Sequence, residues 1–382
     1  MTAKQLNYIS DFKCDSSKCI QNCCLIYTIR IDKNIVELYK KEKPELLDHV
    51  IKEKEDRYII PSNNNGCSLL KNGLCQIHCD HGEKYLPRVC YTYPRCFYRF
   101  NGEIFITSNL LCDHLNNSIL TTDNAFDWVG VSIERIPEPL EDSLEGKFNG
   151  NKNAELINTS NTFVNSIDDT TFSSEEALIR LILIARLFDK IHISQWPLMY
   201  KIYLNIINKE KVTSKYNDID ELSGLDKRNF IGPLIHIMLT VNKTRYNSEK
   251  IETLLKSVIY CLEKNSPADL RNLYNKLAHS TPLEIILKKY IKVKLAEVIF
   301  PICNWNTCSD DLTLISTAYT LFRLILLANS EKLDSFQDLK EIAKIIATLE
   351  PSLFLERKKL FKEFESFGFL NSNQLIGTVS QL

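Results

Sequence analysis

Ten of the thirteen cysteines lie between residues 14 and 112. Four of them fall in CDSSKCIQNCC (14–24), and more follow in GCSLLKNGLC (66–75) and LPRVCYTYPRC (86–96). Thiolates bind zinc and iron–sulfur clusters, and one four-coordinate site needs only four of them. The first third of the chain therefore predicts a metal site, with either two sites or several cysteines that serve the structure.

The composition favours metal over disulfides. With 382 residues the chain can bury a large core without covalent staples. The opening MTAKQLNYISDFKC lacks the charged and apolar regions of a secretory signal, so we expect a cytoplasmic protein whose thiols stay reduced. Apolar runs such as LILIA (181–185) are too short to cross a membrane, and a net charge of -1 provides no basic field. We expect neither a membrane nor a nucleic-acid partner.

The cysteine spacing does not identify the metal. C-x4-C-x3-C-C differs from the C-x2-C knuckle of zinc fingers, but His78, His81 and His114 are close to cysteines in the sequence, so a mixed Cys/His zinc site is an alternative. Neighbouring Cys23 and Cys24 point in different directions in any regular backbone, so one of them faces a core or a second metal. Five cysteines are expected to be buried, unliganded thiols that pack as small apolar residues: Cys79, Cys96, Cys261, Cys303 and Cys308.

A β-hairpin is expected within the cysteine-rich part. In CFYRFNGEIFIT (96–107) two aromatic and β-branched runs are joined by an Asn-Gly pair, the strongest short-range hairpin signal. Pairing about this turn sets Cys96 opposite Thr107 and, if the pairing continues, brings Cys90 back toward Cys112. Residues 32–55 begin like a helix, which Asp32 or Asn34 caps and Pro44 ends or restarts.

The rest of the chain predicts helices. We expect a cysteine-rich domain over 1–125, a linker or irregular insertion over 126–172 because of its polar composition, and an all-α domain over 173–382. Ser173 and Glu176 have the spacing of a capping box ahead of a helix-periodic apolar run. The fold class is mainly α, with a small metal-binding N-terminal region that contains a β-hairpin, followed by a helical bundle. Further helices are expected at 195–209, 248–264, 266–279, 282–300, 311–329 and 335–349.

The motifs together resemble a known family. The order C-x4-C-x3-C-C, GCSLLKNGLCQIH, GEKYLPRVCYTYPR and a hydrophobic strand ending in Cys112 is similar to the flagellin lysine-N-methylases. That family belongs to a wider group with zinc- or iron-chelating domains that carry a CC-containing motif. The resemblance is specific from Cys14 to Cys112 and weaker in EEALIRLILIARLFDK and LKKYIKVKLAEVIFP.

The resemblance implies S-adenosylmethionine-dependent methylation of flagellin lysines by a protein with a [4Fe-4S] cluster, zinc being the alternative metal. Tyr93 and Arg95 match the family's YPR triplet and are implied to contact the methyl donor. Arg95 would hold the donor's carboxylate or offset the charge of a thiolate cluster; the alternative is a surface ion pair. The metal ligands that the resemblance implies are Cys14, Cys19, Cys23, Cys24, Cys67, Cys75, Cys90 and Cys112.

Two questions about the chemistry stay open at this stage. Radical enzymes that use the same donor carry C-x3-C-x2-C; Cys19 and Cys23 fit its first half, but Ile26 occupies the third position. The alternative function is a non-catalytic zinc- or iron-binding module, or a scaffold, with a helical domain that docks a partner. Side chains near the motif cysteines that are able to accept the proton of a substrate lysine are Tyr91, Tyr93, Tyr98 and Asp113.

Overall fold

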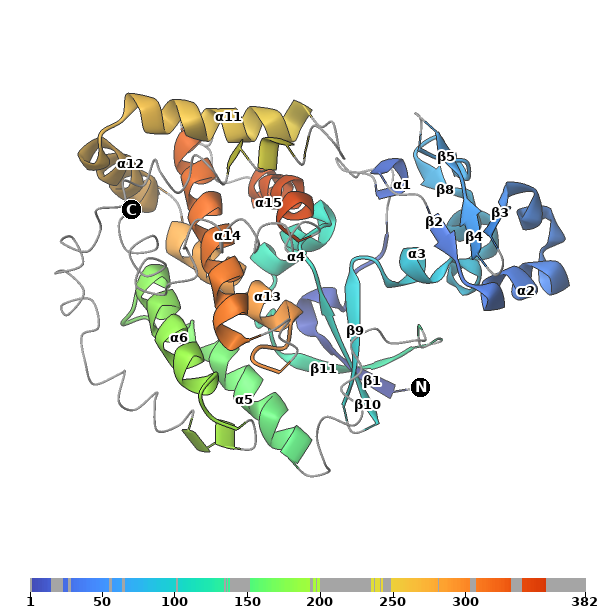
Figure 1. Cartoon of the computed structure of the whole chain (residues 1–382), viewed down its shortest axis with the longest axis horizontal. Coiled ribbons are helices and arrows are strands. Elements are labelled where there is room, and N and C mark those ends of the chain that lie inside the picture. The colour runs from blue at the N-terminus through green and yellow to red at the C-terminus, as the bar shows by residue number, and fades with distance from the viewer. Residues whose placement is uncertain are drawn as a thin grey trace. The chain divides into compact units, whose positions relative to one another are not determined.

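The chain forms two compact units in the computed structural model (Figure 1). The cysteine unit comprises Met1–Ser118 and Thr122–Glu145, and the helical unit comprises Ile119–Thr121 and Gly146–Leu382. The residues that the structure describes are 2–14, 23–26, 29–54, 57–63, 66–100, 102–133, 135, 137, 152–192, 195–196, 198–199, 235–236, 238–240, 242, 249–280, 282–302, 307–330 and 339–354.

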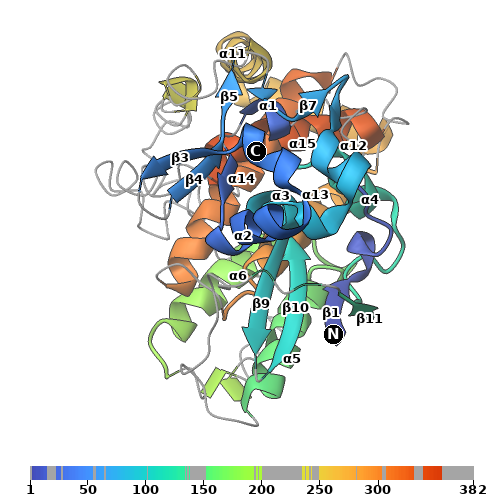
Figure 2. The same ribbon diagram turned by 90° about the vertical axis from the view of Figure 1, so that its right-hand side faces the viewer.

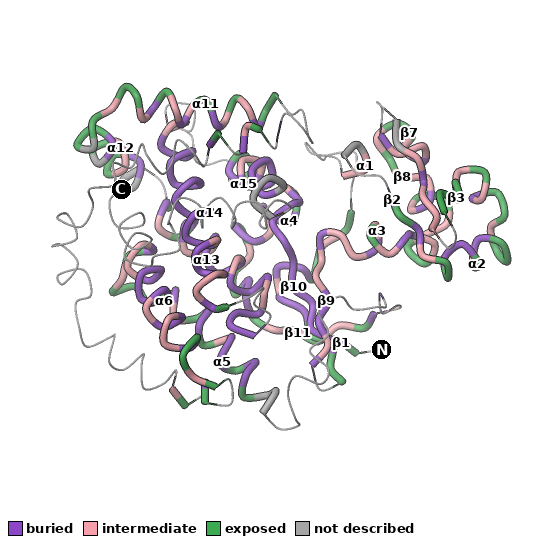
Figure 3. Tube along the Cα trace, in the orientation of Figure 1, coloured by how far each residue is buried: buried purple, intermediate pink, exposed green. Residues whose placement is uncertain are grey.

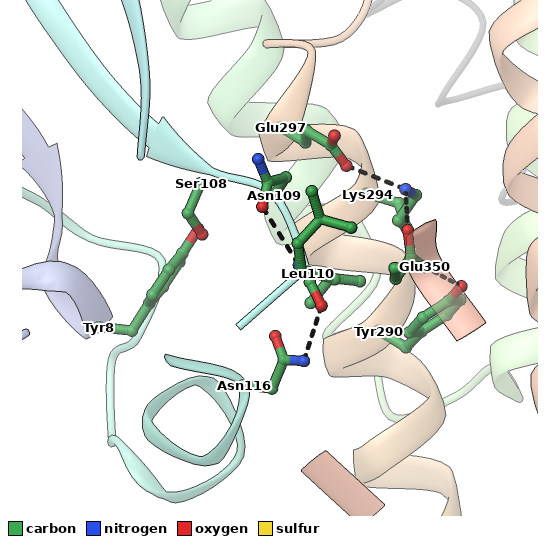
Figure 4. Close-up of polar contacts among 10 residues, drawn as sticks. Tyr8, Ser108, Asn109, Leu110, Asn116, Tyr290, Lys294, Glu297 and Glu350 are labelled. Atoms are coloured by element: carbon green, nitrogen blue, oxygen red, sulfur yellow. Dashed lines mark hydrogen bonds and ion pairs between the residues drawn. The ribbon is translucent and has the colours of Figure 1, made fainter. Parts of the chain in front are cut away.

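A four-stranded sheet in the order β11-β1-β10-β9 organises one part of the cysteine unit. Its strands are β1 (Thr2–Leu6), β9 (Arg95–Phe100), β10 (Glu103–Ser108) and β11 (Trp128–Ser132). β1 runs parallel to β10 and antiparallel to β11. Every residue of β10 from Ile104 to Ser108 is buried, as expected of a central strand covered on both faces. The Tyr8 hydroxyl lies 2.9 Å from Ser108 Oγ and ties the strand to the segment after β1 (Figure 4).

The expected hairpin is confirmed. β9 and β10 pair antiparallel, and Cys96 lies opposite Thr107. Gly102 in the connecting turn has φ +77°, a left-handed conformation that glycine adopts without the steric penalty of a side chain. The left-handed glycine therefore sets the register of the β9–β10 hairpin. This register fixes where the chain enters and leaves the cysteine region.

Small sheets and short helices make up the rest of the cysteine unit (Figures 1 and 2). A three-stranded sheet has the order β2-β4-β3, and two further ladders have only two residues in each strand. The strands are β2 (Ile29–Ile31), β3 (Ile51–Lys54), β4 (Arg57–Ile60), β5 (Ser62–Asn63), β6 (Gly66–Cys67), β7 (Leu70–Lys71) and β8 (Leu74–Cys75). The helices are η1 (Asn7–Ile9), α1 (Cys23–Ile26), α2 (Lys33–Glu42), η3 (Pro44–His49), η4 (Ile77–His81), η5 (Glu83–Tyr85), α3 (Arg88–Thr92) and α4 (Asp113–Thr121).

The segment 32–55 follows the expectation in part. Asp32 immediately precedes α2, and the helix ends before Pro44, which begins η3. The helical interpretation is wrong for the end of this segment, because β3 pairs there with β4. Its IKEK sequence is exposed throughout, so no apolar periodicity distinguished a strand from a helix.

The helical unit packs around one central helix. α14 is buried over nearly its whole length (Figure 3) and contacts α6, α11, α12 and α13. Within the described ranges, α14 is the helix long and apolar enough to cross a membrane, but 89% of that window is buried inside the protein. This burial is what the central helix of a bundle requires. The helices are α5 (Lys152–Ser166), α6 (Ser174–Phe188), α11 (Glu249–Lys264), α12 (Pro267–Ser280), α13 (Leu283–Glu297), α14 (Cys308–Ala328) and α15 (Leu339–Phe354).

Helix signals in the sequence located most of these elements. The Glu176 N–H donates to Ser173 Oγ at 3.1 Å, so Ser173 caps α6 as its spacing predicts. Helices expected near 248–264, 266–279, 282–300, 311–329 and 335–349 are present as α11 to α15, with ends shifted by a few residues. The expected helix at 195–209 lies mostly outside the described residues.

Two regular elements occur in the segment 126–172 that we expected to be a linker or insertion. β11 forms the edge of the four-stranded sheet, and α5 is a helix of 15 residues. Asparagine, serine and threonine dominate α5, but Leu156 and Phe163 are buried on it and Ile167 follows on the same face. This narrow apolar stripe supports the helix despite its polar composition.

A buried ionic cluster joins α13 to α15 in the helical unit. Lys294 Nζ lies 2.9 Å from Glu297 Oε2 and 3.0 Å from Glu350 Oε2 (Figure 4). The Tyr290 hydroxyl donates to Glu350 Oε1 at 2.7 Å. Burial lowers the pKa of Lys294, but Glu297 and Glu350 outweigh burial and hold that pKa above its ordinary value. The lysine therefore stays charged and links the two helices.

Candidate metal centre

The structure describes seven of the eight motif cysteines, and Cys19 lies outside the described residues. Cys24 is on α1, Cys67 ends β6, Cys75 ends β8 and Cys90 is on α3. The described cysteines are thiols that form no disulfide.

Two short loops present the sulfurs of Cys67 and Cys75 to backbone donors. The Leu69 N–H donates to the Cys67 sulfur, and the N–H groups of Ile77 and His78 donate to the Cys75 sulfur. Such N–H to sulfur bonds stabilise thiolates and are typical of metal–thiolate sites. The Gln76 N–H donates to the Leu69 carbonyl at 2.9 Å and joins the two loops.

The thiols of this region lie within electrostatic reach of one another. Burial, with repulsion from Cys24 and Cys67, raises the pKa of Cys75 to about 11, although the hydrogen bonds from the backbone oppose this shift. Burial likewise raises the pKa of Cys90 well above its ordinary value, with additional repulsion from Cys24, Cys75, Cys67 and Cys14. Burial and then Cys24 also raise the pKa of Cys67, although its Leu69 hydrogen bond opposes them. Together these thiols resist ionisation unless a cation compensates them.

The sulfurs of Cys23 and Cys24 lie within hydrogen-bonding reach of each other, although we expected these neighbouring side chains to point in different directions. A hydrogen bond between the two sulfurs lowers the pKa of Cys24, although burial opposes this shift. The same bond, followed by burial and by repulsion from Cys24, Cys14 and Cys90, raises the pKa of Cys23. The ionisations of Cys23 and Cys24 are therefore linked to each other.

Cys112 and Cys14 extend the thiol region. Cys112 is the N-cap residue of α4, and its sulfur accepts from the N–H groups of His114 and Leu115. Burial, with smaller contributions from Asp113 and Cys14, raises the pKa of Cys112 to about 12 against these two bonds. Cys14 is exposed and interacts electrostatically with both Cys90 and Cys112.

The donor set fits a thiolate-ligated metal group. Seven described motif thiols gather in one unit, and backbone N–H groups already donate to three of their sulfurs: Cys67, Cys75 and Cys112. Within the part of the chain that the structure describes, no three Cys, His, Asp or Glu side chains are arranged to bind a single metal ion. The chemistry of these donors therefore suits a thiolate-bound metal group, whereas the arrangement of the described side chains does not form a site for a single ion.

The nearby histidines lie beside other groups. His78 Nε2 lies 3.8 Å from Glu83 Oε1, and His81 Nε2 lies 4.0 Å from Glu45 Oε1. The ring of His114 packs against Phe12, with 6.2 Å between centroids. The mixed Cys/His zinc site stays an alternative prediction, which these contacts do not favour.

Tyr93 and Arg95 contact the backbone and aromatic rings. The Tyr93 hydroxyl donates to the Leu111 carbonyl at 2.7 Å. Arg95 Nη2 donates to the Tyr91 carbonyl, and its guanidinium carbon lies 5.0 Å from the Tyr91 ring and 5.7 Å from the Phe97 ring. These contacts hold Arg95 in place by cation–π attraction. Contact of Tyr93 and Arg95 with a methyl donor stays a prediction.

Sequence reasoning missed two residues beside the thiols. Tyr39 on α2 is fully buried, and its hydroxyl donates to the Tyr85 carbonyl at 2.6 Å. Burial, then Cys90, Cys75 and Cys67, raise the pKa of Tyr39, so Tyr39 lies within electrostatic reach of these thiols. Tyr39 belongs to no sequence motif, so only the fold reveals it.

Arg135 is the second of these residues. It donates to the carbonyls of Lys84 at 3.2 Å and Leu86 at 3.0 Å, and its guanidinium carbon lies 4.2 Å from the Tyr91 ring. Burial lowers its pKa, and its charge opposes the rise in the pKa of Tyr39. Arg135 thus brings positive charge close to a region that thiolates would make negative.

The cysteines outside the motif behave differently from one another. Cys79 on η4 is exposed, so the expectation that it is buried is wrong: η4 is a single turn whose Cys79 side faces solvent. Cys96 is half-buried. Cys261 and Cys308 are buried on α11 and α14, as expected for packing residues. Cys303 lies outside the described residues.

Comparison with known proteins gives distant relatives. Over 220 residues the chain is 23% identical to a lysine-N-methylase of Salmonella choleraesuis, covering 55% of this chain and 54% of that protein. Over 136 residues it is 25% identical to the flagellar biosynthetic protein FliU of Salmonella muenchen, covering 33% of this chain and 80% of that protein. An uncharacterized protein of Methanocaldococcus jannaschii is 26% identical over 266 residues, covering 69% of this chain and 83% of that protein.

No protein-family model and no solved structure matches the chain. The chain spans about half the length of the lysine-N-methylases that it matches. Its similarity to proteins named lysine-N-methylase supports the resemblance that the cysteine motifs indicate.

Proposed function

We propose that this protein is an S-adenosylmethionine-dependent lysine N-methylase that acts on flagellin and carries an iron–sulfur cluster in its cysteine unit. The observation that carries the proposal is the gathering of the motif thiols in a protein similar to lysine-N-methylases. We place the reaction in the cytoplasm, because clustered thiols stay reduced there.

The proposed reaction is a displacement at the methyl carbon of the donor. The lysine Nε lone pair forms the new N–C bond while the C–S bond breaks and its electrons return to sulfur, giving S-adenosylhomocysteine. The amine must be neutral when it attacks, although free lysine has a pKa of about 10.4. The substrate ammonium therefore loses a proton to a base or to water before transfer, and burial of the lysine favours this loss.

Candidate proton acceptors differ in their contacts. The hydroxyls of Tyr91 and Tyr93 donate to the carbonyls of Arg135 and Leu111, so both already have hydrogen-bond acceptors. Asp113 begins α4, and a carboxylate side chain accepts hydrogen bonds without donating one. We therefore rank Asp113 ahead of the two tyrosines as the group that receives the proton.

A cluster would be held by motif cysteines of this unit, whose N–H to sulfur bonds suit thiolate ligands. When bound, an iron–sulfur cluster with an open iron supplies a Lewis-acid position for amino and carboxylate groups. Arg95 and Arg135 both contact Tyr91 of α3, and each is fixed by carbonyl and aromatic contacts. Fixed cations of this kind orient a carboxylate and offset the charge of thiolates.

The test is methyl transfer by the full chain. Anaerobically purified protein is incubated with unmethylated flagellin and S-adenosylmethionine carrying a labelled methyl group, and flagellin peptides are mapped by mass spectrometry. We expect label on lysine Nε atoms. Cluster-containing protein that transfers no label would contradict the proposal and favour a metal-binding scaffold.

A further inference from the structure

The open edges of the sheets in the cysteine unit differ in charge. An exposed edge strand presents unpaired backbone N–H and C=O groups to other strands, and proteins usually protect such edges with charged side chains or bulges. Among the described strands of at least three residues, those at sheet edges are β2, β3, β9 and β11. Three of these edges carry charged side chains: Arg30 in β2, Lys52, Glu53 and Lys54 in β3, and Arg95 and Arg99 in β9. β11, with the sequence WVGVS, has neither a charged residue nor a proline.

The backbone groups of β11 are divided between its neighbour β1 and the outer edge of the sheet. β11 pairs antiparallel with β1, and Gly130 lies opposite Lys4. In the same register, the Asn7 N–H donates to the Asp127 carbonyl at 2.8 Å. Hydrogen-bonded and non-hydrogen-bonded pairs alternate along an antiparallel ladder, so the pair that contains Gly130 is not hydrogen-bonded. The N–H and C=O groups of Gly130, and likewise those of Ser132, therefore point away from β1.

The outer edge of β11 reaches the surface. Gly130 and Ser132 are exposed, and Val129 and Val131 are half-buried. A surface strand with apolar side chains, outward backbone groups and no charge is a template for pairing with a strand of another chain. The sequence of β11 itself supplies a complementary strand.

β11 is self-complementary in an antiparallel arrangement. A two-fold axis through Gly130 sets this glycine opposite Gly130 of the partner subunit, and sets Val129 opposite Val131 of the partner subunit. Both glycines direct their N–H and C=O groups outward, so they form a hydrogen-bonded pair. Opposed β-branched side chains stabilise paired strands, and no like charges meet along WVGVS. A second copy of this chain therefore fits the edge.

The two-fold arrangement also closes the assembly. Two four-stranded sheets join into one sheet of eight strands, whose ends are the two copies of β9 with their arginines. β11 has five residues and spans about 17 Å, so the paired edge is short. A small interface of this kind forms reversibly and depends on the protein concentration.

We infer that two copies of this chain associate through antiparallel pairing of their β11 strands about Gly130. The resulting dimer joins two cysteine units through one continuous sheet. Its formation requires neither a metal nor methyl transfer, so its failure and the failure of the proposed function are separate results.

The experiment compares three substitutions at Gly130 in the full chain. Gly130→Lys and Gly130→Glu each place like charges opposite one another across the two-fold axis, which destabilises paired strands. Gly130→Ala is the matched control, because it adds a side chain without charge. A Cβ atom on Gly130 has no described neighbouring atom within 4 Å, and the backbone there is not in the left-handed region, so all three variants should fold as wild type does. Sedimentation equilibrium over a range of concentrations measures association, and melting temperatures check folding.

We expect a monomer–dimer equilibrium in wild type and in Gly130→Ala. The dissociation constants of Gly130→Lys and Gly130→Glu should each rise by about fivefold or more. An equimolar mixture of these two variants should associate at least as tightly as Gly130→Ala, because opposite charges then face each other across the axis. Equal association of all variants, or no recovery in the mixture, would overturn the pairing of β11 about Gly130.

Hydrogen exchange distinguishes the other occupants of this edge. Peptides covering 127–133 should exchange more slowly as the concentration of wild type rises. Wild type that stays monomeric at about 0.5 mM overturns the dimer. In that case, protection of these peptides at every concentration would indicate that another segment of the same chain covers β11, and protection only with added flagellin would indicate a substrate strand.

Discussion

Lys294→Met should strongly destabilise the helical unit. Lys294 Nζ contacts Glu297 and Glu350 at 2.9 and 3.0 Å, and the three side chains are 11%, 4% and 1% exposed. Methionine keeps the length of the side chain but removes its charge. Two carboxylates would then remain buried beside one another without a cation, while the Tyr290 hydroxyl still donates to Glu350.

The expected size follows from this burial. Removing one partner of a buried ion pair costs about 3–5 kcal/mol, because the remaining charge has lost its compensation. Exposed pairs contribute far less, because water and salt screen them. The two cases can be compared within this unit.

Lys256→Met is the matched control. Lys256 Nζ lies 2.5 Å from Glu252 Oε1 on α11, and the two side chains are 64% and 47% exposed. The same substitution should cost at most about 0.5 kcal/mol there. A double-mutant cycle adds Glu350→Gln, which should cost less in the Lys294→Met protein than in wild type because its ionic partner is already absent.

Hydrogen exchange measured by mass spectrometry on peptides of α13 and α15 gives the local free energy of opening, without assuming that both units unfold together. We expect a large loss of protection in Lys294→Met and almost none in Lys256→Met. Costs for the two variants that agree within about 1 kcal/mol would refute the reasoning.

Thermal unfolding and hydrogen exchange check three further expectations. Glu297 and Glu350 hold the pKa of Lys294 above the ordinary 10.5 despite burial, so the native state keeps its proton longer than the unfolded state. The contribution of Lys294 to the free energy of unfolding should be complete at neutral pH and fall as the pH rises beyond about 10.5. Thermal unfolding should therefore show a steeper loss of stability with rising pH in wild type than in Lys294→Met. Gly102→Ala places a side chain at φ +77° and should cost about 1 kcal/mol; a higher melting temperature would contradict this. Ser173→Ala removes the acceptor for the Glu176 N–H and should cost about 1 kcal/mol, seen as faster exchange in the first turn of α6, whereas unchanged exchange would exclude the cap.

Sequence patterns predicted elements whose signals are local. The Asn-Gly pair located the β9–β10 hairpin, and the capping box located the start of α6. Apolar periodicity did not predict α5, in which most residues are polar and the apolar residues occupy one face. It also did not predict the ladders of two residues, which are too short to have a period.

The candidate site shows the same limit. Spacing and composition indicated a metal region, but they did not divide eight cysteines into ligands and supporting residues. Cys24 and Cys90 are far apart in the sequence. The packing of α1 against β6 brings the segments of Cys24 and Cys67 together, and the hydrogen bond from the Gln76 N–H to the Leu69 carbonyl joins the loops of Cys67 and Cys75. Tyr39 belongs to no motif, so its position beside the thiols depends on tertiary structure alone.

Metal analysis of the wild-type chain tests the central claim most directly. Protein purified without oxygen is assayed for iron, zinc and acid-labile sulfide, and its visible spectrum is recorded. We predict brown protein with broad visible absorbance and about four iron and four sulfide per chain. Colourless protein with stoichiometric zinc, or with no metal, would contradict the account.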